Sequence, residues 1–214
     1  TSNYVFSFGV VDPCMQPYTP IHDIQGNGAA TPLSGTVTTM GVVVGDYELP
    51  NASYQIKGYY IQSPEAGYDA DPLTSEGVFV YNAGRNNVSV GDLVRVTGTV
   101  SDYQDQTQLS APEGGTVACG TGTVSTTDVN FPLTDVNDLE KYEGMLVKLP
   151  QTMYVTEHYQ LGRFGQVTLS YDGRLQQPTN VVEPGTPAID LQAANNLRKI
   201  ILDDGDNLQN TDPI

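Results

Sequence analysis

The sequence predicts a mainly β protein made of short strands and turns, and three observations lead to this prediction. The composition favours strands and turns, with 22 Gly, 14 Pro and 13 Tyr, and long runs of helix-forming residues are missing. The stretch VGDLVRVTGTVSDY (90–103) alternates apolar and polar side chains, as a strand with one buried and one solvated face does. Clusters of Gly, Pro, Asn and Asp separate this stretch from similar ones at short spacing.

Five strands are expected in the first part of the chain. They cover residues 35–47, 54–64, 77–84, 90–103 and 114–124. Gly41 lies in the middle of the long first strand, where a glycine favours a bulge or a sharp bend. A long bent strand, a hairpin pair and a strand opened by Gly-Asp are typical of a five-stranded Greek-key barrel, the OB-fold. A β-sandwich is the alternative, because the number of strands alone does not separate the two.

The chain is expected to contain two units. Residues 1–125 form the OB-like barrel with an irregular N-terminal extension, and residues 126–214 form a second, smaller β-rich unit. Within the second unit we expect a short helix over 138–142, strands within 143–159 and 164–178, and a helix over 190–199. Because this unit has few clear strands, it either packs on the barrel or is truncated.

The charge of the chain is strongly acidic, with 9 basic and 25 acidic residues and a net charge of −16. Such a surface keeps a protein soluble and monomeric, so we expect a monomer. DNA carries one negative charge per about 1.7 Å of helix axis, which argues against strong phosphate binding by this chain alone. No apolar run approaches the roughly 18 residues of a membrane span. The N-terminus lacks a basic head and a cleavage site, so any secretion signal is expected to precede this numbering.

The two cysteines, Cys14 and Cys119, predict a structural disulfide. Their surroundings are rich in Gly, Pro and Ser and do not show the spacing of a zinc or thiol-redox site. Pairing them would close a loop of roughly one hundred residues, to which the chain-entropy model assigns about 4.7 kcal/mol. A disulfide of this kind forms in an oxidising compartment, which indicates secretion. Two unpaired core cysteines are the alternative.

Two acidic loops are candidate sites for Ca²⁺. Asp69 and Asp71 lie two residues apart in YDADPLTSEG, and Asp203, Asp204 and Asp206 lie together in DDGDN. Loops that offer carboxylates and carbonyls suit Ca²⁺, which takes six to eight oxygen ligands, although neither loop has the spacing of an EF-hand. Solvated turns are the alternative, because Asp is a common turn residue.

Nucleic-acid binding by the barrel would depend on stacking more than on charge. OB barrels bind single strands with aromatic platforms and a basic groove over strands two and three. The candidate residues are Lys57, Tyr59, Tyr81, Arg95, Arg163 and Phe164. Lys57 and Tyr59 share one face of their strand by alternation, and core packing is the alternative for a ring on the inward side. Arg163 and Phe164 lie in LGRFG, which a tight structural hairpin explains equally well.

No catalytic motif is present in the sequence. The two histidines, His22 and His158, lie in different halves, and we interpret both as surface or satisfied loop residues. The G-x-S-x-G, P-loop and H-E-x-x-H patterns are missing. Metal-assisted phosphodiester hydrolysis needs several convergent carboxylates and a base. We therefore expect the chain to be non-catalytic.

Several segments together resemble secreted bacterial extracellular endonucleases. They are IHDIQGNGAATPLSG (21–35), VGDLVRVTGTVSDY (90–103), LEKYEGMLVKLP (139–150), YQLGRFGQVTLS (159–170) and GRLQQPTN (173–180). YQLGRFGQ is the most distinctive of them, whereas VGDLVRVTG is shared by many OB-folds. These enzymes degrade DNA and carry OB-like modules ahead of a catalytic domain of the endonuclease/exonuclease/phosphatase type. The resemblance runs from about Pro20 to Asp206 and would place the Mg²⁺- or Ca²⁺-dependent catalytic domain beyond Ile214.

The resemblance implies a non-catalytic accessory region of a secreted bacterial nuclease. Such a region would position the downstream catalytic domain of the same chain or help to engage DNA, which is expected to be a weak partner. The alternative is a structural, adhesive or carbohydrate-binding module of the same fold, because a fold does not fix a function. No cofactor is expected in this part of the chain other than Ca²⁺ at the acidic loops.

Overall fold

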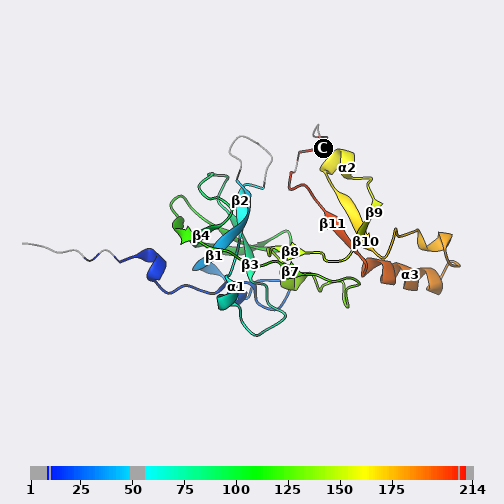
Figure 1. Ribbon diagram of the computed structural model, residues 1–214, viewed down its shortest axis with the longest axis horizontal. Coiled ribbons are helices and arrows are strands. Elements are labelled where there is room, and N and C mark those ends of the chain that lie inside the picture. Colours follow the sequence, from blue (N-terminus) through cyan, green and yellow to red (C-terminus); the bar gives the residue numbers. More distant parts are fainter. Residues whose placement is uncertain (1–8, 10, 49–55, 207, 211–214) are drawn as a thin grey trace, which may run out of the picture.

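A closed five-stranded β-barrel with one added strand forms the first half of the chain (Figure 1). The structure is a computed structural model that describes residues 9, 11–48, 56–206 and 208–210. Two smaller sheets and two α-helices of the described chain come after the barrel in the sequence. The fold confirms the predicted mainly β class and the OB-like barrel, in place of a sandwich.

The barrel follows a Greek-key order. Its strands are β1 (Gly35–Tyr47), β2 (Gly58–Gln62), β3 (Gly77–Tyr81), β4 (Asp92–Tyr103) and β5 (Gln106–Ser110). They lie in the order β1-β2-β3-β5-β4, and β4 pairs with β1 to close the sheet. All neighbours are antiparallel except β3 and β5, which run parallel.

The first strand reaches two neighbours because it is long and bent. Its residues 35–42 pair with β4 and its residues 42–47 with β2. The register shift lies between Val43 and Gly45, so the bulge comes slightly later than the expected position at Gly41. A Cβ at Gly41 would lie 3.1 Å from the carbonyl oxygen of Gln62. The glycine therefore permits a close approach of β1 and β2 where the strand changes partner.

The fifth strand of the barrel is not the one that the sequence predicted. The expected strand 114–124 forms β6 (Thr116–Thr121), which pairs with the beginning of β4 as an addition to the barrel. The strand that lies between β3 and β4 is β5, with the sequence QTQLS. Only Thr107 and Leu109 of β5 are buried, and its outer face consists of Gln and Ser. This composition is not enriched in strands, which is why the sequence did not reveal it.

Alternating apolar residues of the strands fill the interior of the barrel. The buried cluster consists of Ile21, Ile24, Val43, Tyr59, Ile61, Val78, Val80, Val88, Val94, Val96, Val100, Leu109 and Ala111. Its first two members come from a short helix, α1 (Ile21–Gln25), which contacts β1 and β3. The N-terminal extension was expected to be irregular, yet its isoleucines belong to the core.

The second half of the chain forms smaller elements. They are β7 (Thr127–Asp128), β8 (Val147–Lys148), β9 (Met153–Glu157), α2 (Leu161–Phe164), β10 (Val167–Tyr171), α3 (Thr186–Asn196) and β11 (Lys199–Leu202), with the 3₁₀ turns η3 (Glu140–Tyr142) and η4 (Pro178–Asn180). The 3₁₀ turns η1 (Pro13–Met15) and η2 (Glu65–Gly67) belong to the first half. One sheet has the order β11-β10-β9, and β7 pairs with β8. The expected helix 138–142 is the turn η3, and the expected helix 190–199 begins earlier, at Thr186.

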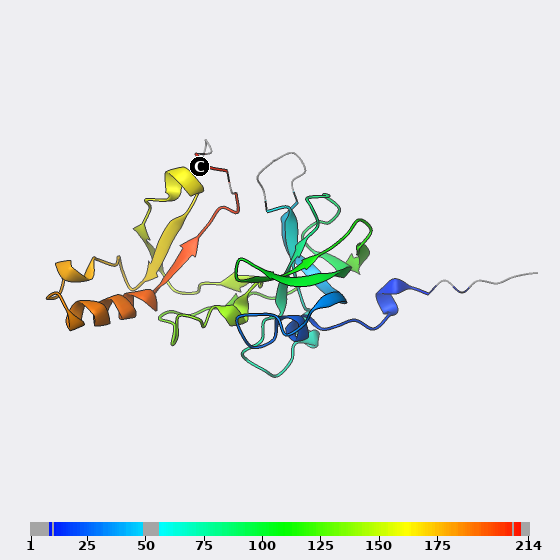
Figure 2. The ribbon, with the colours of Figure 1, turned by 180° about the vertical axis from the view of Figure 1, so that it is seen from behind.

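A separate small core supports these elements. Val129, Phe131 and Leu133 are buried there against partly buried residues from β9, β10 and β11. Figures 1 and 2 show the three-stranded sheet and α3 at the end of the molecule opposite the N-terminal segment. None of the helices in the described part of the chain is long and apolar enough to cross a membrane.

The chain that leads from the barrel to this second core lies directly on the barrel backbone. A Cβ at Gly77 would collide with the backbone of Gly144. Ser75 Oγ donates a hydrogen bond of 2.6 Å to the carbonyl oxygen of Glu143, and the amide of Leu146 donates one of 2.8 Å to Gln62 Oε1. Segment 143–146 is therefore attached to the ends of β2 and β3.

The predicted disulfide between Cys14 and Cys119 is confirmed. The bond joins η1 to β6, and the two Cα atoms lie 5.6 Å apart. Arg95 holds the same N-terminal segment, because its guanidinium donates hydrogen bonds of 2.8 and 2.7 Å to the carbonyl oxygens of Gln16 and Pro17. Two independent links thus fix the N-terminal extension to the barrel.

Replacing both cysteines, Cys14→Ser with Cys119→Ser, is expected to lower the free energy of unfolding by about 2–4 kcal/mol. The reason is that the bond restricts the unfolded chain over a sequence separation of 105 residues. Equilibrium unfolding in urea without reductant measures the difference. Wild-type protein in reductant should behave like the variant, and the variant itself should not respond to reductant. Equal unfolding midpoints for oxidised wild type and variant would contradict the prediction.

Candidate functional site

A groove of about 740 Å³ crosses the outer face of β2, β3 and β5. Its lining consists of Ile56, Tyr60, Phe79, Tyr81, Tyr103, Gln104, Gln106, Gln108 and Ser110. OB barrels bind their ligands on the face of strands two and three and on the loops after strands one and four. The groove occupies this place, because Ile56 precedes β2 and Gln104 belongs to the turn between β4 and β5.

Strand alternation places the aromatic rings on the outside of the barrel. Tyr60 and Phe79 stand opposite each other on β2 and β3, and their ring centroids lie 5.0 Å apart. A Cβ at Gly58 would collide with the ring of Phe79 and with the carbonyl oxygen of Val80. The missing side chain at Gly58 is therefore what lets the Phe79 ring lie over β2.

A hydrogen bond between two lining side chains, Gln106 and Tyr60, spans the centre of the groove. Gln106 Nε2 donates to the hydroxyl of Tyr60 over 3.0 Å and so links β5 to β2 across β3. Burial raises the pKa of the Tyr60 hydroxyl, which stays neutral and can both donate and accept. The rings at the rim are more accessible, with Tyr81 38% and Tyr103 60% exposed.

The turn between β4 and β5 positions one side of the groove. Gln104 and Asp105 both have positive φ, 52° and 62°, as in a two-residue type I′ hairpin turn. The tight turn carries Tyr103 at the end of β4 and Gln106 at the start of β5 to the same edge of the groove. Its central residues include no glycine, so the sequence did not signal a hairpin here.

Among the residues that the structure describes, none with a charged side chain lines the groove. Next to β5, outside the groove lining, lies Glu143, whose Oε1 accepts a hydrogen bond of 2.8 Å from the amide of Thr107. Burial raises the pKa of Glu143 to about 7, and repulsion from Glu140 adds to this. In the described part of the chain, the groove is thus lined by aromatic rings and amides and by no cation.

The structure brings only part of the predicted nucleic-acid set to this groove. Tyr81 lines it, whereas Tyr59 is fully buried and its hydroxyl lies 2.7 Å from Thr116 Oγ1. Burial raises the pKa of Tyr59. Tyr59 therefore offers no ring face to a base, and its assignment as a stacking residue is corrected to core packing. The outward neighbour Tyr60 takes the expected place.

The predicted cationic residues do not line the groove. Arg95 is engaged with backbone carbonyls of the N-terminal segment, and Lys57 lies beside Gly84 just before β2. Arg163 stacks on Phe164 in α2, with 4.8 Å from its guanidinium carbon to the ring centroid, and its Nε donates to Gln209 Oε1 over 3.0 Å. This pair belongs to the C-terminal half, apart from the barrel face (Figure 1).

The carboxylates of the two acidic loops mostly accept hydrogen bonds from their own turns. Asp71 Oδ1 accepts from the amide of Leu73. The second loop behaves in the same way: Asp203, Asp204 and Asp206 accept from the amides of Gly205, Asp206 and Leu208. Asp69 also accepts from its own turn, through the amide of Asp71, but in addition it lies beside His22 and Glu76. Sequence reasoning did not connect these three residues, which come from separate segments.

Known proteins add no assignment for this groove. Comparisons with models of protein families, with curated proteins and with solved structures find no match for the chain. The resemblance to secreted endonucleases stays a prediction. The chemistry of the groove itself, with stacked rings and amides on the ligand face of an OB-type barrel, is therefore the basis for a function.

The raised pKa of Glu143 predicts a pH-dependent loss of stability that Glu143→Gln removes. The carboxyl has an ordinary pKa of 4.5 when unfolded and about 7 when folded, so the folded state keeps its proton to higher pH. The contribution of the protonated carboxyl to the free energy of unfolding is full below pH 4.5 and is lost as the pH rises to about 7. Glu143→Gln lacks this loss. Because Glu143 is partly exposed, the variant's free energy of unfolding should rise by only about 1–2 kcal/mol relative to wild type as the pH increases over this range.

Urea unfolding of both proteins at several pH values between 4 and 8 measures this difference. Glutamine keeps an oxygen that can accept from the Thr107 amide, so the change removes mainly the charge. Glu113→Gln, at an exposed glutamate, serves as the matched control and should follow wild type. A difference between Glu143→Gln and wild type that does not vary with pH would contradict the assignment.

Proposed function

We propose that the chain is a non-catalytic binding region whose barrel holds a polymeric ligand in the aromatic groove. The observation that supports this is the convergence of four aromatic rings and three glutamines on the outer face of β2, β3 and β5. Binding sites combine apolar and aromatic walls with a few polar groups that fix orientation. Tyr81 and Tyr103 supply exposed ring surface, and the Gln106 and Gln108 amides supply donors and acceptors.

The charge of the groove favours a neutral oligosaccharide as the ligand. OB-type barrels bind oligosaccharides as well as oligonucleotides on this face. Those that bind single strands combine stacking rings with a positively charged groove. Here no lining residue from the described ranges is cationic, and the chain carries a net charge of −16. Stacking on the apolar face of a sugar and hydrogen bonding of its hydroxyls to amides require no cation.

A second candidate is the accessory role in a secreted bacterial nuclease that the resemblance implies. Its ligand would be single-stranded DNA, and the catalytic domain of the parent protein would be its partner. The stacking platform on the ligand face of the barrel favours this role, because every base has a face that can stack on an aromatic ring. The disulfide between Cys14 and Cys119 fits an oxidising compartment and hence secretion.

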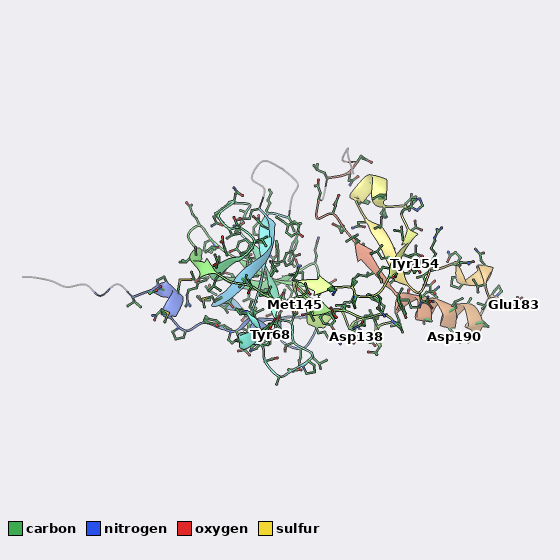
Figure 3. The ribbon with its side chains drawn as sticks, in the orientation of Figure 1. Tyr68, Asp138, Met145, Tyr154, Glu183 and Asp190 are labelled. Atoms are coloured by element: carbon green, nitrogen blue, oxygen red, sulfur yellow. A yellow bond between two sulfur atoms is a disulfide. The ribbon has the colours of Figure 1, made fainter. Side chains whose placement is uncertain are left out.

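Truncation of the rim tyrosines tests the site. Tyr81→Ala and Tyr103→Ala are each expected to weaken oligosaccharide binding at least about fivefold, or about 1 kcal/mol, because each removes an exposed stacking surface. Calorimetry with a panel of neutral cello-, xylo-, malto- and chito-oligosaccharides measures the affinity. The matched control is Tyr154→Ala, at a tyrosine of β9 that is 46% exposed and lies on the C-terminal sheet (Figure 3).

Parallel titration with single-stranded DNA at low and physiological salt separates the two candidates. Oligosaccharide binding that both groove variants weaken and Tyr154→Ala leaves intact supports the proposal. Binding of DNA alone, with a steep salt dependence and the same response to the variants, supports the nuclease role in its place. If neither probe binds, or if Tyr154→Ala has the same effect as the groove variants, the groove is not the binding site.

A further inference from the structure

Three side chains from separate segments meet at the side of the barrel, away from the groove. His22 comes from α1, Asp69 from the loop after η2, and Glu76 from the residue before β3. Each offers one ligand atom, and these atoms all lie within 4.8 Å of one another. In the described part of the chain this is the one group of three or more such residues that meets that distance. We propose that these three residues bind a divalent transition-metal ion of the Zn²⁺ type.

The buried carboxylate of Glu76 is the second observation that points to a cation. Glu76 is only 4% exposed. Its Oε1 lies 3.0 Å from His22 Nδ1 and accepts a hydrogen bond of 2.9 Å from the amide of Asp69. Its Oε2 is also buried, and no donor from the described residues reaches it. A buried carboxylate oxygen without a partner is costly, and a metal ion would satisfy it.

A simple ion pair between His22 and Glu76 does not account for the whole arrangement. It would explain one oxygen of Glu76 and leave the other without a partner. It would also leave the Asp69 carboxylate next to a second carboxylate, an arrangement that like charges disfavour. The nearby cation, Lys141, also lines the pocket beside Asp69 and Glu76, but its Nζ lies 3.7 Å from Asp138 Oδ1 and 5.4 Å from the centre of the Tyr142 ring.

Hydrogen bonds orient the Asp69 carboxylate, and a pocket beside it leads to solvent. Asp69 Oδ1 accepts hydrogen bonds of 3.0 Å from the amide of Asp71 and from Thr74 Oγ1, which orient the carboxylate and leave Oδ2 for an ion. A pocket of about 320 Å³ opens beside Asp69 and Glu76, and Tyr68 and Met145 also line it. Figure 3 shows these two residues close to each other at the side of the barrel nearest the C-terminal sheets.

The ligand chemistry favours a metal of the Zn²⁺ type over Ca²⁺. Imidazole suits Zn²⁺, Ni²⁺ and Cu²⁺, whereas Ca²⁺ requires six to eight oxygen ligands. Bonds of about 2.0–2.2 Å to a tetrahedral ion place neighbouring ligand atoms roughly 3.3–3.6 Å apart. His22 Nδ1 and Glu76 Oε1 lie 3.0 Å apart in a hydrogen bond, so an ion bound by Nδ1 would replace that bond after a small shift of the side chains. Solvent in the pocket would supply the fourth ligand. Of the two residues in the predicted Ca²⁺ loop, the proposed site uses Asp69 and not Asp71. Its other ligands are His22 and Glu76.

Zn²⁺ titration of the chelator-treated chain tests this site independently of the groove. Calorimetry should show one Zn²⁺ ion bound per chain, and the melting temperature should rise by several degrees as Zn²⁺ saturates the folded state. Asp69→Asn and Glu76→Gln should each weaken Zn²⁺ binding at least about tenfold, because each removes a charged ligand. Asp69 is exposed, so Asp69→Asn tests the site even if the buried Glu76 variant does not fold.

Two matched controls separate this site from binding at the Asp71 carboxylate and from binding at the other histidine, His158. Asp71→Asn changes a carboxylate that lines the same pocket, and His158→Ala removes the other histidine of the chain, which is exposed. Both should bind Zn²⁺ within about twofold of wild type. No binding by wild type, binding that Asp69→Asn does not weaken, or binding that His158→Ala abolishes would each overturn the proposal. Ca²⁺ binding in preference to Zn²⁺, lost in Asp71→Asn, would overturn it in favour of the Asp69–Asp71 loop.

Discussion

The pairing of β1 with β4 is the constraint on which the rest of the barrel depends. Residues 35–42 of β1 run antiparallel to residues 93–100 of β4, and this ladder turns an open sheet into a closed one. In the closed sheet, each strand has one face toward the core and one toward solvent. The alternation of side chains along the strand therefore decides whether a residue is buried or exposed. On β2 it sends Tyr59 into the core and Tyr60 into the groove. The aromatic surface outside is therefore a consequence of the packing inside.

The sequence predicted the long strands well and the short ones poorly. Strands 35–47 and 90–103 carry enough alternating residues to be recognised, and the first has the predicted bounds. β5 has five residues with only Thr107 and Leu109 inward, so its pattern is too short to stand out. The choice of Tyr59 as the outward ring was wrong, because a one-residue shift of register exchanges the faces of Tyr59 and Tyr60. Of the residues that line the groove, only Tyr81 belongs to the predicted set.

Other functional groups depend on packing that no local pattern encodes. His22 and Glu76 are 54 positions apart in the sequence and meet only because α1 docks beside β3. Charged residues with structural roles were equally hard to recognise. Glu48 is fully buried and accepts hydrogen bonds from Asn82 and from the amides of Asn87 and Val88. The Glu48 carboxylate thus has a structural role that its position in the sequence did not indicate.

The close approach of Gly77 and Gly144 joins parts of the molecule that would otherwise be separate. Met145, next to Gly144, lines the pocket beside Glu76, while Glu143 accepts from Thr107 on β5 and Leu146 donates to Gln62 on β2. One short stretch of backbone thus lies beside the pocket at Glu76 and against two strands of the barrel. If a ligand at either site orders this stretch, reciprocity requires that the affinity for the other ligand change by the same factor. Gly77 and Gly144 permit the contact, because neither backbone leaves room for a side chain on the other.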